Sequence, residues 1–381
     1  MKHYLWHRFM FVFLRVIAVG FVKRLMGYKC TKYKGPDVPT LIIANHNSNL
    51  DAAFLMMGFT RHAYCLASEH TFRNGRPSKI MKAVFDPIPI NKTQTDITAI
   101  KEMMRRLKAG ASVCLFAEGD RSYSGRTAPI GISAAKLAKK SGADMITFRI
   151  EGGYFTTPRW AGSRRKGKMY GVFVNKYTAS ELKDMTDRQV LEAIERDIHE
   201  DSYELQKVRQ IRYRGKNLAE GIEAALYLCP GCMGIGTIVS GGDRFSCACG
   251  LSGKYTETCF LEGESLPFTT ITEWCDWQEA ELKGIIERSG EGPICSDKAQ
   301  QMFSVRAAVD RTLVGEGDLW IDRRKLHCAG LDFPLDDIIS IVTVGRMTLL
   351  FALKGGAMYE VRSAVPRSAL KYKDIFRVLT G

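Results

Sequence analysis

Short apolar runs alternate with helix-forming segments through the first half of the chain. The runs predict buried strands at residues 41–44, 63–68, 88–90, 112–118, 145–150 and 171–175. Helical spacing of apolar positions, or helix-forming composition, marks residues 4–26, 96–108, 131–141 and 180–213. This alternation predicts an α/β fold, a layered domain with a largely parallel sheet.

The pattern changes after residue 220. Residues 229–250 are rich in Cys and Gly, and residues 273–288 have the spacing of one amphipathic helix. From about residue 293 short β-like runs follow closely, and a helical stretch at 368–379 closes the chain. The second half is therefore predicted to be a small Cys-rich segment followed by a helix and a mainly β domain.

The first helical segment, residues 4–26, is apolar and aromatic but carries Arg8 and Arg15. Placing Arg15 at the centre of a bilayer would cost about 2.5–3.5 kcal/mol, a cost that a helix lying in the membrane plane avoids. We therefore predict a membrane-interface helix at 1–28 and a peripheral or monotopic protein on the cytoplasmic face of the membrane. The alternative is a helix packed on the protein's own core.

Charge and cysteine content narrow the range of functions. Lys and Arg number 55 against 41 Asp and Glu, and residues 1–220 hold 38 of the basic and 20 of the acidic residues. Such a basic half attracts nucleic acid, anionic lipid headgroups or phosphorylated small molecules. The 11 cysteines do not form the dense framework of a secreted protein, so we expect a reducing compartment.

Three polar features follow predicted strands of the basic half. His46 and Asp51 flank a turn where a bend would let the carboxylate hold one imidazole nitrogen and leave the other as general base. Glu118, Gly119, Arg121 and Ser122 form a turn suited to clamping a phosphorylated alcohol, and Lys92 offers a second cation. Taken singly, the first two features are equally compatible with a capped turn and a charged surface turn, and Lys92 alone is more typical of a solvated surface lysine.

Together these residues resemble the glycerolipid acyltransferases typified by 1-acylglycerol-3-phosphate (lysophosphatidic acid) acyltransferase. The resemblance covers about residues 30–180 and rests on HX4D at 46–51 lying about 70 residues before F-x-E-G-x-R-S. Ala117 stands where the family usually has Pro, and Asn91–Lys92 replaces its Asp–Arg-like pair. The helix and strand after the E-G motif are also similar.

The resemblance implies direct acyl transfer from acyl-CoA or acyl-carrier protein to a hydroxyl. His46 would take the proton of the acceptor hydroxyl, and Asp51 would fix the tautomer and stabilise the imidazolium. Lys92, Glu118, Gly119, Arg121 and Ser122 would bind the substrate. General-base catalysis of this kind contributes about 10²–10⁴-fold.

Four cysteines crowd the start of the second half. Cys229 and Cys232 form one close pair, and Cys247 and Cys249 form another beside glycines. Two such pairs match a structural Zn²⁺ site with four thiolate ligands and resemble a zinc ribbon, although C-x-C departs from the usual spacing. The alternative is four free thiols in a small hairpin.

We therefore predict four domains: the interface helix at 1–28, an acyltransferase domain at 29–220, a zinc ribbon at 221–256, and a helix plus β-rich region at 257–381 that weakly resembles a pleckstrin-homology fold. The predicted function is acylation of a lysophospholipid, with 1-acyl-sn-glycerol-3-phosphate first, in phospholipid biosynthesis on an anionic membrane surface. Glycerol-3-phosphate or another lysolipid is an alternative acceptor. A zinc-ribbon nucleic-acid-binding protein and an inert lipid-binding scaffold are the rival functions, although the acidic second half argues against nucleic-acid contact there.

Overall fold

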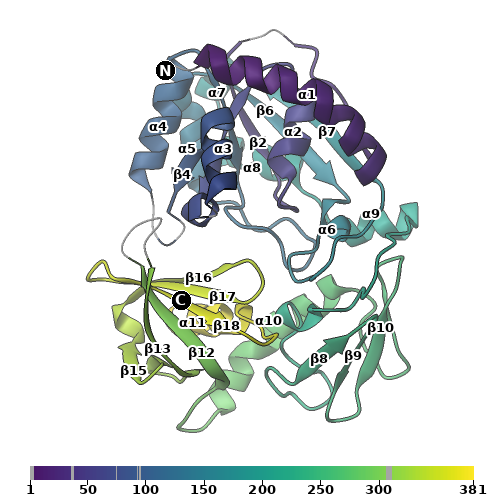
Figure 1. The fold of residues 1–381 in the computed structure, drawn as a ribbon, viewed down its shortest axis with the longest axis vertical. Helices are drawn as coiled ribbons and strands as arrows, with labels where there is room; N and C mark the ends of the chain where they lie inside the picture. Colours follow the sequence, from purple (N-terminus) through teal and green to yellow (C-terminus); the bar gives the residue numbers. More distant parts are fainter. Residues whose placement is uncertain (1–3, 36–37, 74, 92, 94–95, 306–310) are drawn as a thin grey trace. The chain divides into compact units, whose positions relative to one another are not determined.

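The chain divides into two units in the computed structural model (Figure 1), which describes residues 4–35, 38–73, 75–91, 93, 96–305 and 311–381. The first unit comprises Met1–Pro158 and Arg165–Arg214, and the second comprises Arg159–Arg164 and Gly215–Gly381. The predicted interface helix thus clusters with the α/β part of the chain. The Cys-rich segment clusters with the β-rich region.

The first unit is built on a seven-stranded sheet with the order β1-β7-β6-β2-β5-β3-β4. Neighbouring strands are parallel except for β6 and β7, so the predicted α/β fold with a largely parallel sheet is confirmed. The strands are β1 (Tyr28–Cys30), β2 (Thr40–Ala44), β3 (Ala63–Ser68), β4 (Ile88–Ile90), β5 (Ser112–Phe116), β6 (Asp144–Glu151) and β7 (Met169–Tyr177).

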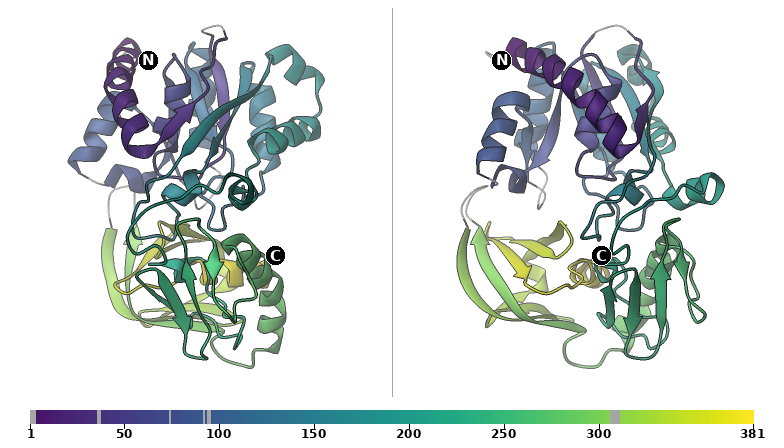
Figure 2. Two further views of the ribbon diagram at one scale, coloured as in Figure 1. Left: turned by 90° about the vertical axis from the view of Figure 1, so that its right-hand side faces the viewer. Right: turned by 45° about the vertical axis from the view of Figure 1, so that its right-hand side comes forward.

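Helices cover both faces of this sheet (Figure 2). In β2, Leu41 and Ile43 enter a core with α4, α5 and α8, whereas Ile42 and Ala44 enter a second core with α2. The continuous apolar sequence of β2 follows from burial on both sides. The helices are α1 (Tyr4–Met26), α2 (Asp51–Gly58), α3 (Arg76–Phe85), α4 (Ile97–Lys108), α5 (Ile132–Ser141), α6 (Gly153–Thr156), α7 (Ala179–Asp184), α8 (Asp187–Ile198) and α9 (Ser202–Arg209).

Helix α1 begins and ends where the apolar pattern predicted. Its buried side places His7 and Phe11 against the ring of His62, and the Trp6 indole N–H donates to the Ala83 carbonyl of α3 at 3.0 Å. None of the helices in the described part of the chain has the length and apolar character needed to span a bilayer.

The described residues of the second unit form two antiparallel sheets and two α-helices. The smaller sheet has the order β11-β10-β9-β8 and the larger the order β15-β14-β13-β12-β18-β17-β16. The Cys-rich and mainly β character predicted for this half is confirmed. The elements are β8 (Ile238–Gly241), β9 (Arg244–Cys247), β10 (Ser252–Tyr255), β11 (Leu261–Glu262), α10 (Ile271–Arg288), β12 (Cys295–Val305), β13 (Arg311–Ile321), β14 (Lys325–Cys328), β15 (Leu331–Pro334), β16 (Ile338–Val344), β17 (Thr348–Leu353), β18 (Met358–Ser363) and α11 (Leu370–Thr380).

Candidate functional site

The register of two central strands brings two of the predicted motifs together. Strands β2 and β5 are parallel, and Ala44 lies opposite Phe116. His46 follows Ala44 by two residues, and Glu118 follows Phe116 by two residues. They meet because the backbone N–H of His46 donates to Glu118 Oε1 at 2.6 Å. The His46 imidazole stacks on the Phe116 ring, with 4.6 Å between ring centroids.

His46 and Asp51 contact each other across the bend between β2 and α2. The distance from His46 Nδ1 to Asp51 Oδ2 is 2.8 Å, and the Asp51 side chain is fully buried whereas the imidazole is 23% exposed. Because a carboxylate oxygen accepts hydrogen bonds, we assign the proton to Nδ1 and the lone pair to Nε2. This arrangement leaves Nε2 as the basic nitrogen.

Backbone amides hold the Asp51 carboxylate in place. Its Oδ2 accepts the N–H groups of Asn47 at 2.6 Å and Ser48 at 2.8 Å, and its Oδ1 accepts the Ser48 hydroxyl. Asp51 is also the first residue of α2, where a negative charge is favoured by the helix dipole. The carboxylate that orients the imidazole is therefore itself oriented by the turn it closes.

Glu118 holds two backbone segments. In addition to the His46 N–H at Oε1, its Oε2 accepts the N–H of Ala128 at 2.8 Å. Burial raises the pKa of Glu118 to about 8; the charges of Glu200 and Asp51 raise it as well, and the two accepted N–H groups oppose the rise. The sequence placed Glu118 in substrate binding, whereas in the structure both of its oxygens accept main-chain amides.

The other predicted substrate-binding residues lie in or near the turn after β5. Gly119 has φ +71°, and an added Cβ would meet nothing, so backbone conformation is what favours glycine there. The buried Ser122 hydroxyl accepts the Gly125 N–H at 2.9 Å, and the N–H of the half-buried Arg121 donates to Asp120 Oδ1. Lys92 lies outside the described residues.

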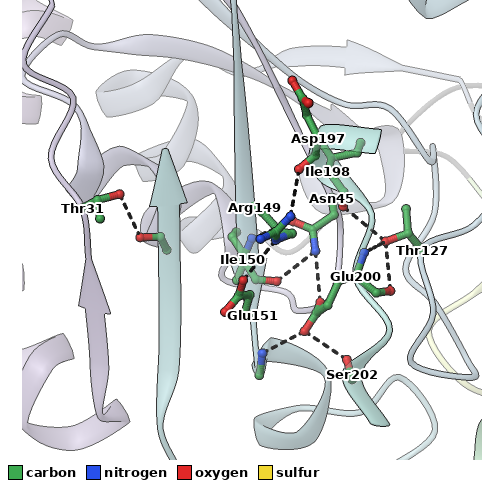
Figure 3. Close-up of polar contacts among 12 residues, drawn as sticks. Thr31, Asn45, Thr127, Arg149, Ile150, Glu151, Asp197, Ile198, Glu200 and Ser202 are labelled. Atoms are coloured by element: carbon green, nitrogen blue, oxygen red, sulfur yellow. Dashed lines mark hydrogen bonds and ion pairs between the residues drawn. The ribbon is translucent and has the colours of Figure 1, made fainter. Parts of the chain in front are cut away.

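Asn45, Asn47 and Glu200, which the sequence did not single out, complete the surroundings of the His46 turn, and Figure 3 draws Asn45 and Glu200. The Asn45 amide extends the ladder between β2 and β6, since it donates to the Ile150 carbonyl at 2.9 Å and accepts the Ile150 N–H at 2.7 Å. The amides of Asn45 and Asn47 also donate to the carboxylate of Glu200. The sequence signal for Glu200 is indirect. The Asp201-Ser-x-Glu pattern marks the start of a helix, and this would have placed Glu200 in the loop before that helix.

The four predicted metal ligands gather at one point of the second unit. The sulfurs of Cys229, Cys232, Cys247 and Cys249 all lie within 4.8 Å of one another. The Sγ atoms of Cys229 and Cys249 are 3.6 Å apart, and those of Cys232 and Cys247 are 3.7 Å apart. Tetrahedral Zn²⁺ with Zn–S bonds of about 2.3 Å requires S···S separations of about 3.8 Å, so this donor set fits a closed zinc site.

Helix α10 anchors the segment that carries the first cysteine pair. The Trp274 indole N–H donates to the Leu228 carbonyl at 2.8 Å. The Gln278 amide donates to the Ala225 carbonyl and accepts the Tyr227 N–H. A metal held by four thiolates would therefore brace this segment against α10 and would have a structural task.

A second His–Asp pair with the same spacing occurs in the second unit. His327 Nδ1 lies 2.6 Å from Asp332 Oδ1, and the two residues are cross-strand partners in the β14–β15 hairpin. The Asp332 side chain is 48% exposed and also accepts the ammonium of Lys325. This pair provides an internal comparison for the pair at 46–51.

Comparison with known proteins places the first motifs in a family context. Residues 2–151 match the family model described as acyltransferase, and this segment contains His46, Asp51 and the turn at 118–122. The crystal structure of the 1-acyl-sn-glycerophosphate (LPA) acyltransferase PlsC from Thermotoga maritima is similar at 19% sequence identity and a TM-score of 0.41; the similarity covers 51% of this chain and 82% of that chain. The family match confirms the resemblance to acyltransferases on which the sequence interpretation rested.

Proposed function

We propose that this chain, whose residues 2–151 match the acyltransferase family, moves a fatty acyl group from acyl-CoA or acyl-carrier protein to the free hydroxyl of a lysophospholipid, with 1-acyl-sn-glycerol-3-phosphate as the first candidate. The observation that carries the proposal is the 2.8 Å contact between His46 Nδ1 and Asp51 Oδ2. It supports a general base whose second nitrogen is free of the carboxylate.

The chemistry assigned to the pair is a proton-coupled acyl transfer. His46 Nε2 takes the proton of the acceptor hydroxyl while that oxygen attacks the thioester carbonyl carbon. Collapse of the tetrahedral intermediate breaks the C–S bond, and the imidazolium returns the proton to the departing thiolate, which leaves as a thiol. Asp51 stabilises the imidazolium throughout, so no serine or cysteine nucleophile is required.

The acceptor phosphate is assigned to the basic residues near this turn. Arg121 follows Gly119 on the loop beside Glu118, and an arginine offers forked donors that match phosphate. Lys92 stays a prediction from the sequence as the second cation. A lysophospholipid is favoured over an uncharged alcohol because residues 1–220 carry the whole basic excess of the chain.

The exposed side of α1 supports work at an anionic membrane surface. Apolar side chains are exposed on α1 and on the adjoining α3, namely Leu5, Trp6, Phe9, Val12, Phe13, Val16, Ile80 and Phe85. Arg8, Lys79 and Lys82 are exposed on the same two helices. Aromatic and aliphatic groups of this kind insert at the headgroup boundary, and each cation near an anionic leaflet adds about 1 kcal/mol.

His46→Ala tests the reaction, and His327→Ala is its matched control. Both variants remove a histidine whose Nδ1 contacts a carboxylate five residues later. With acyl-CoA or acyl-carrier protein and a panel of lysolipids and glycerol-3-phosphate, we expect His46→Ala to lose product formation and His327→Ala to keep it. Normal turnover by a folded His46→Ala protein would refute the proposed role. The acceptor that gives the highest kcat/KM identifies the substrate.

Vesicle binding separates the proposal from its nucleic-acid rival. We expect the wild-type chain to sediment with vesicles containing phosphatidylserine at physiological salt and to leave duplex DNA unshifted. A DNA shift without vesicle binding would favour the zinc-ribbon nucleic-acid reading.

A further inference from the structure

Glu200 is a buried carboxylate beside the turn that carries His46, and Figure 3 shows its contacts with Asn45 and Ser202. It lies between α8 and α9, outside residues 2–151, and is 2% exposed. Its Oε2 accepts the side-chain amides of Asn45 and Asn47. Its Oε1 accepts the N–H of Gly152 at 2.9 Å and the hydroxyl of Ser202 at 3.1 Å. Four donors therefore converge on one carboxylate.

The backbone of Glu200 is tied to a different segment of the site. Its N–H donates to Thr127 Oγ1 at 2.8 Å, and its carbonyl accepts the Thr127 N–H at 2.9 Å. The next residue in that segment, Ala128, donates its N–H to Glu118. Glu200 thus has its main chain on the segment that follows the Gly119–Ser122 loop and its side chain on the turn that carries His46.

Asn47 is the residue through which the Glu200 carboxylate reaches the reacting group. The Asn47 side chain donates to Glu200 and to the Ile150 carbonyl, while its backbone N–H donates to Asp51 Oδ2 at 2.6 Å. A shift of Asn47 would therefore move the carboxylate that orients the imidazole. Gly153 allows this close approach, because a Cβ there would lie 3.1 Å from Asn47 Cβ.

We propose that Glu200 is a positioning residue for acyl transfer, which holds the His46–Asp51 turn through Asn47 and fixes it against the segment at 127–128 that follows the loop at 119–122. This inference rests on the proposed function. A buried carboxylate is expensive: burial raises the pKa of Glu200 to about 8 even though the accepted hydrogen bonds oppose the rise. Filling space at this point would need only an apolar side chain, whereas orienting two amide side chains needs an acceptor.

Glu200→Gln tests the inference with little change of shape. Glutamine replaces one acceptor oxygen by a donor, and that donor must face either the Gly152 N–H or the Asn45 and Asn47 amides. We expect kcat to fall by about 100-fold, the loss that a misplacement of about 1 Å produces, with KM for the lysophospholipid near its wild-type value. Glu151→Gln is the matched control, since that buried carboxylate is held by Arg149 and Arg209 instead. It should keep kcat.

A double-variant comparison distinguishes positioning from general stability. Asn47→Ala alone should lower kcat by a similar factor, and Glu200→Gln combined with Asn47→Ala should be no slower than the worse single variant, because both act through one contact. Fully multiplicative losses would overturn the inference. Parallel losses of kcat and thermal stability in both Glu200→Gln and Glu151→Gln would overturn it as well.

The remaining outcomes also separate the two proposals. If Glu200→Gln does not fold, Asn47→Ala decides, since it leaves the other three donors on Glu200, and an unchanged kcat there refutes positioning. Wild-type kcat in folded Glu200→Gln, beside an inactive His46→Ala, refutes this inference alone. A wild-type chain that transfers no acyl group from either donor refutes the proposed function and this inference with it.

Discussion

Asp51→Asn isolates the charge of the orienting carboxylate from its geometry. In the wild type, Oδ2 accepts His46 Nδ1–H together with the backbone N–H groups of Asn47 and Ser48. Three donors at one position select the oxygen of an introduced Asn there. Its NH₂ group then faces the Ser48 hydroxyl, which can turn to accept. The tautomer of His46 should therefore survive the substitution, and so should the fold.

The expected loss is the electrostatic stabilisation of the imidazolium. Contact between the two side chains puts their charge centres about 4 Å apart, where two unit charges interact by about 4 kcal/mol at an effective dielectric constant of about 20. At 1.36 kcal/mol for each factor of ten, kcat should fall about 10³-fold. The loss should stay below the roughly 10⁴-fold seen when the corresponding substitution in serine proteases imposes the wrong tautomer.

The assay is the initial rate of diacyl product formation, measured by mass spectrometry of extracted lipid. Asp332→Asn is the matched control, because it makes the same change in a pair of the same spacing. A folded Asp51→Asn protein that keeps turnover within about tenfold of the wild type would refute the electrostatic reasoning. So would an equal loss in Asp332→Asn.

Two further predictions concern metal and pH. Elemental analysis should find one zinc per chain. Cys232→Ser removes an exposed ligand at little packing cost and should lower both zinc content and Tm, whereas Cys65→Ser in the first unit should lower neither. An unchanged zinc content in Cys232→Ser would contradict the proposed zinc site. Burial, followed by the charges of His7 and Arg106, lowers the pKa of His62 from 6.5 to about 4. Between pH 6.5 and pH 4 the unfolded chain therefore binds a proton at His62 that the folded chain does not bind. The stability that is present above pH 6.5 is lost as the pH falls from 6.5 through 4. Urea unfolding at several pH values should show that the free energy of unfolding falls by about 3 kcal/mol less in His62→Leu than in the wild type over this range. An identical pH dependence of the two proteins would contradict this role of His62.

Elements with a strong local pattern could be predicted from the sequence, and weakly patterned ones could not. The helix at 4–26 and the strands β3 and β4 begin and end where apolar runs placed them. Strand β1 was missed because its three residues, Tyr-Lys-Cys, form no apolar run, and α3 was also missed. Helix α3 is an exception to this rule, because its apolar residues Ile80, Val84 and Phe85 recur at helical spacing although only Ser78 of the helix is buried.

Some residues of the candidate site could likewise be predicted from the sequence, and others could not. His46, Asp51 and Glu118 could be found because each follows an apolar strand closely, and parallel pairing then brings strand ends together. Glu200 could not be found, since its partners Asn45 and Asn47 lie about 150 residues earlier and the charged stretch around it reads as continuous helix. Long-range hydrogen bonds to a loop leave no periodic trace in the sequence.

The two His–Asp pairs show that motif spacing alone does not define a catalytic pair. Both place Nδ1 within 2.8 Å of a carboxylate. In the β14–β15 hairpin the contact follows from cross-strand register, and the carboxylate is half-exposed, so water competes with it and its effect on the imidazole is screened. At 46–51 the carboxylate is fully buried and fixed by backbone amides, while Glu118 and Glu200 hold the same turn from two other segments. Three carboxylates around one imidazole-bearing turn are costly to bury, and that cost is consistent with a turn whose geometry serves chemistry rather than stability.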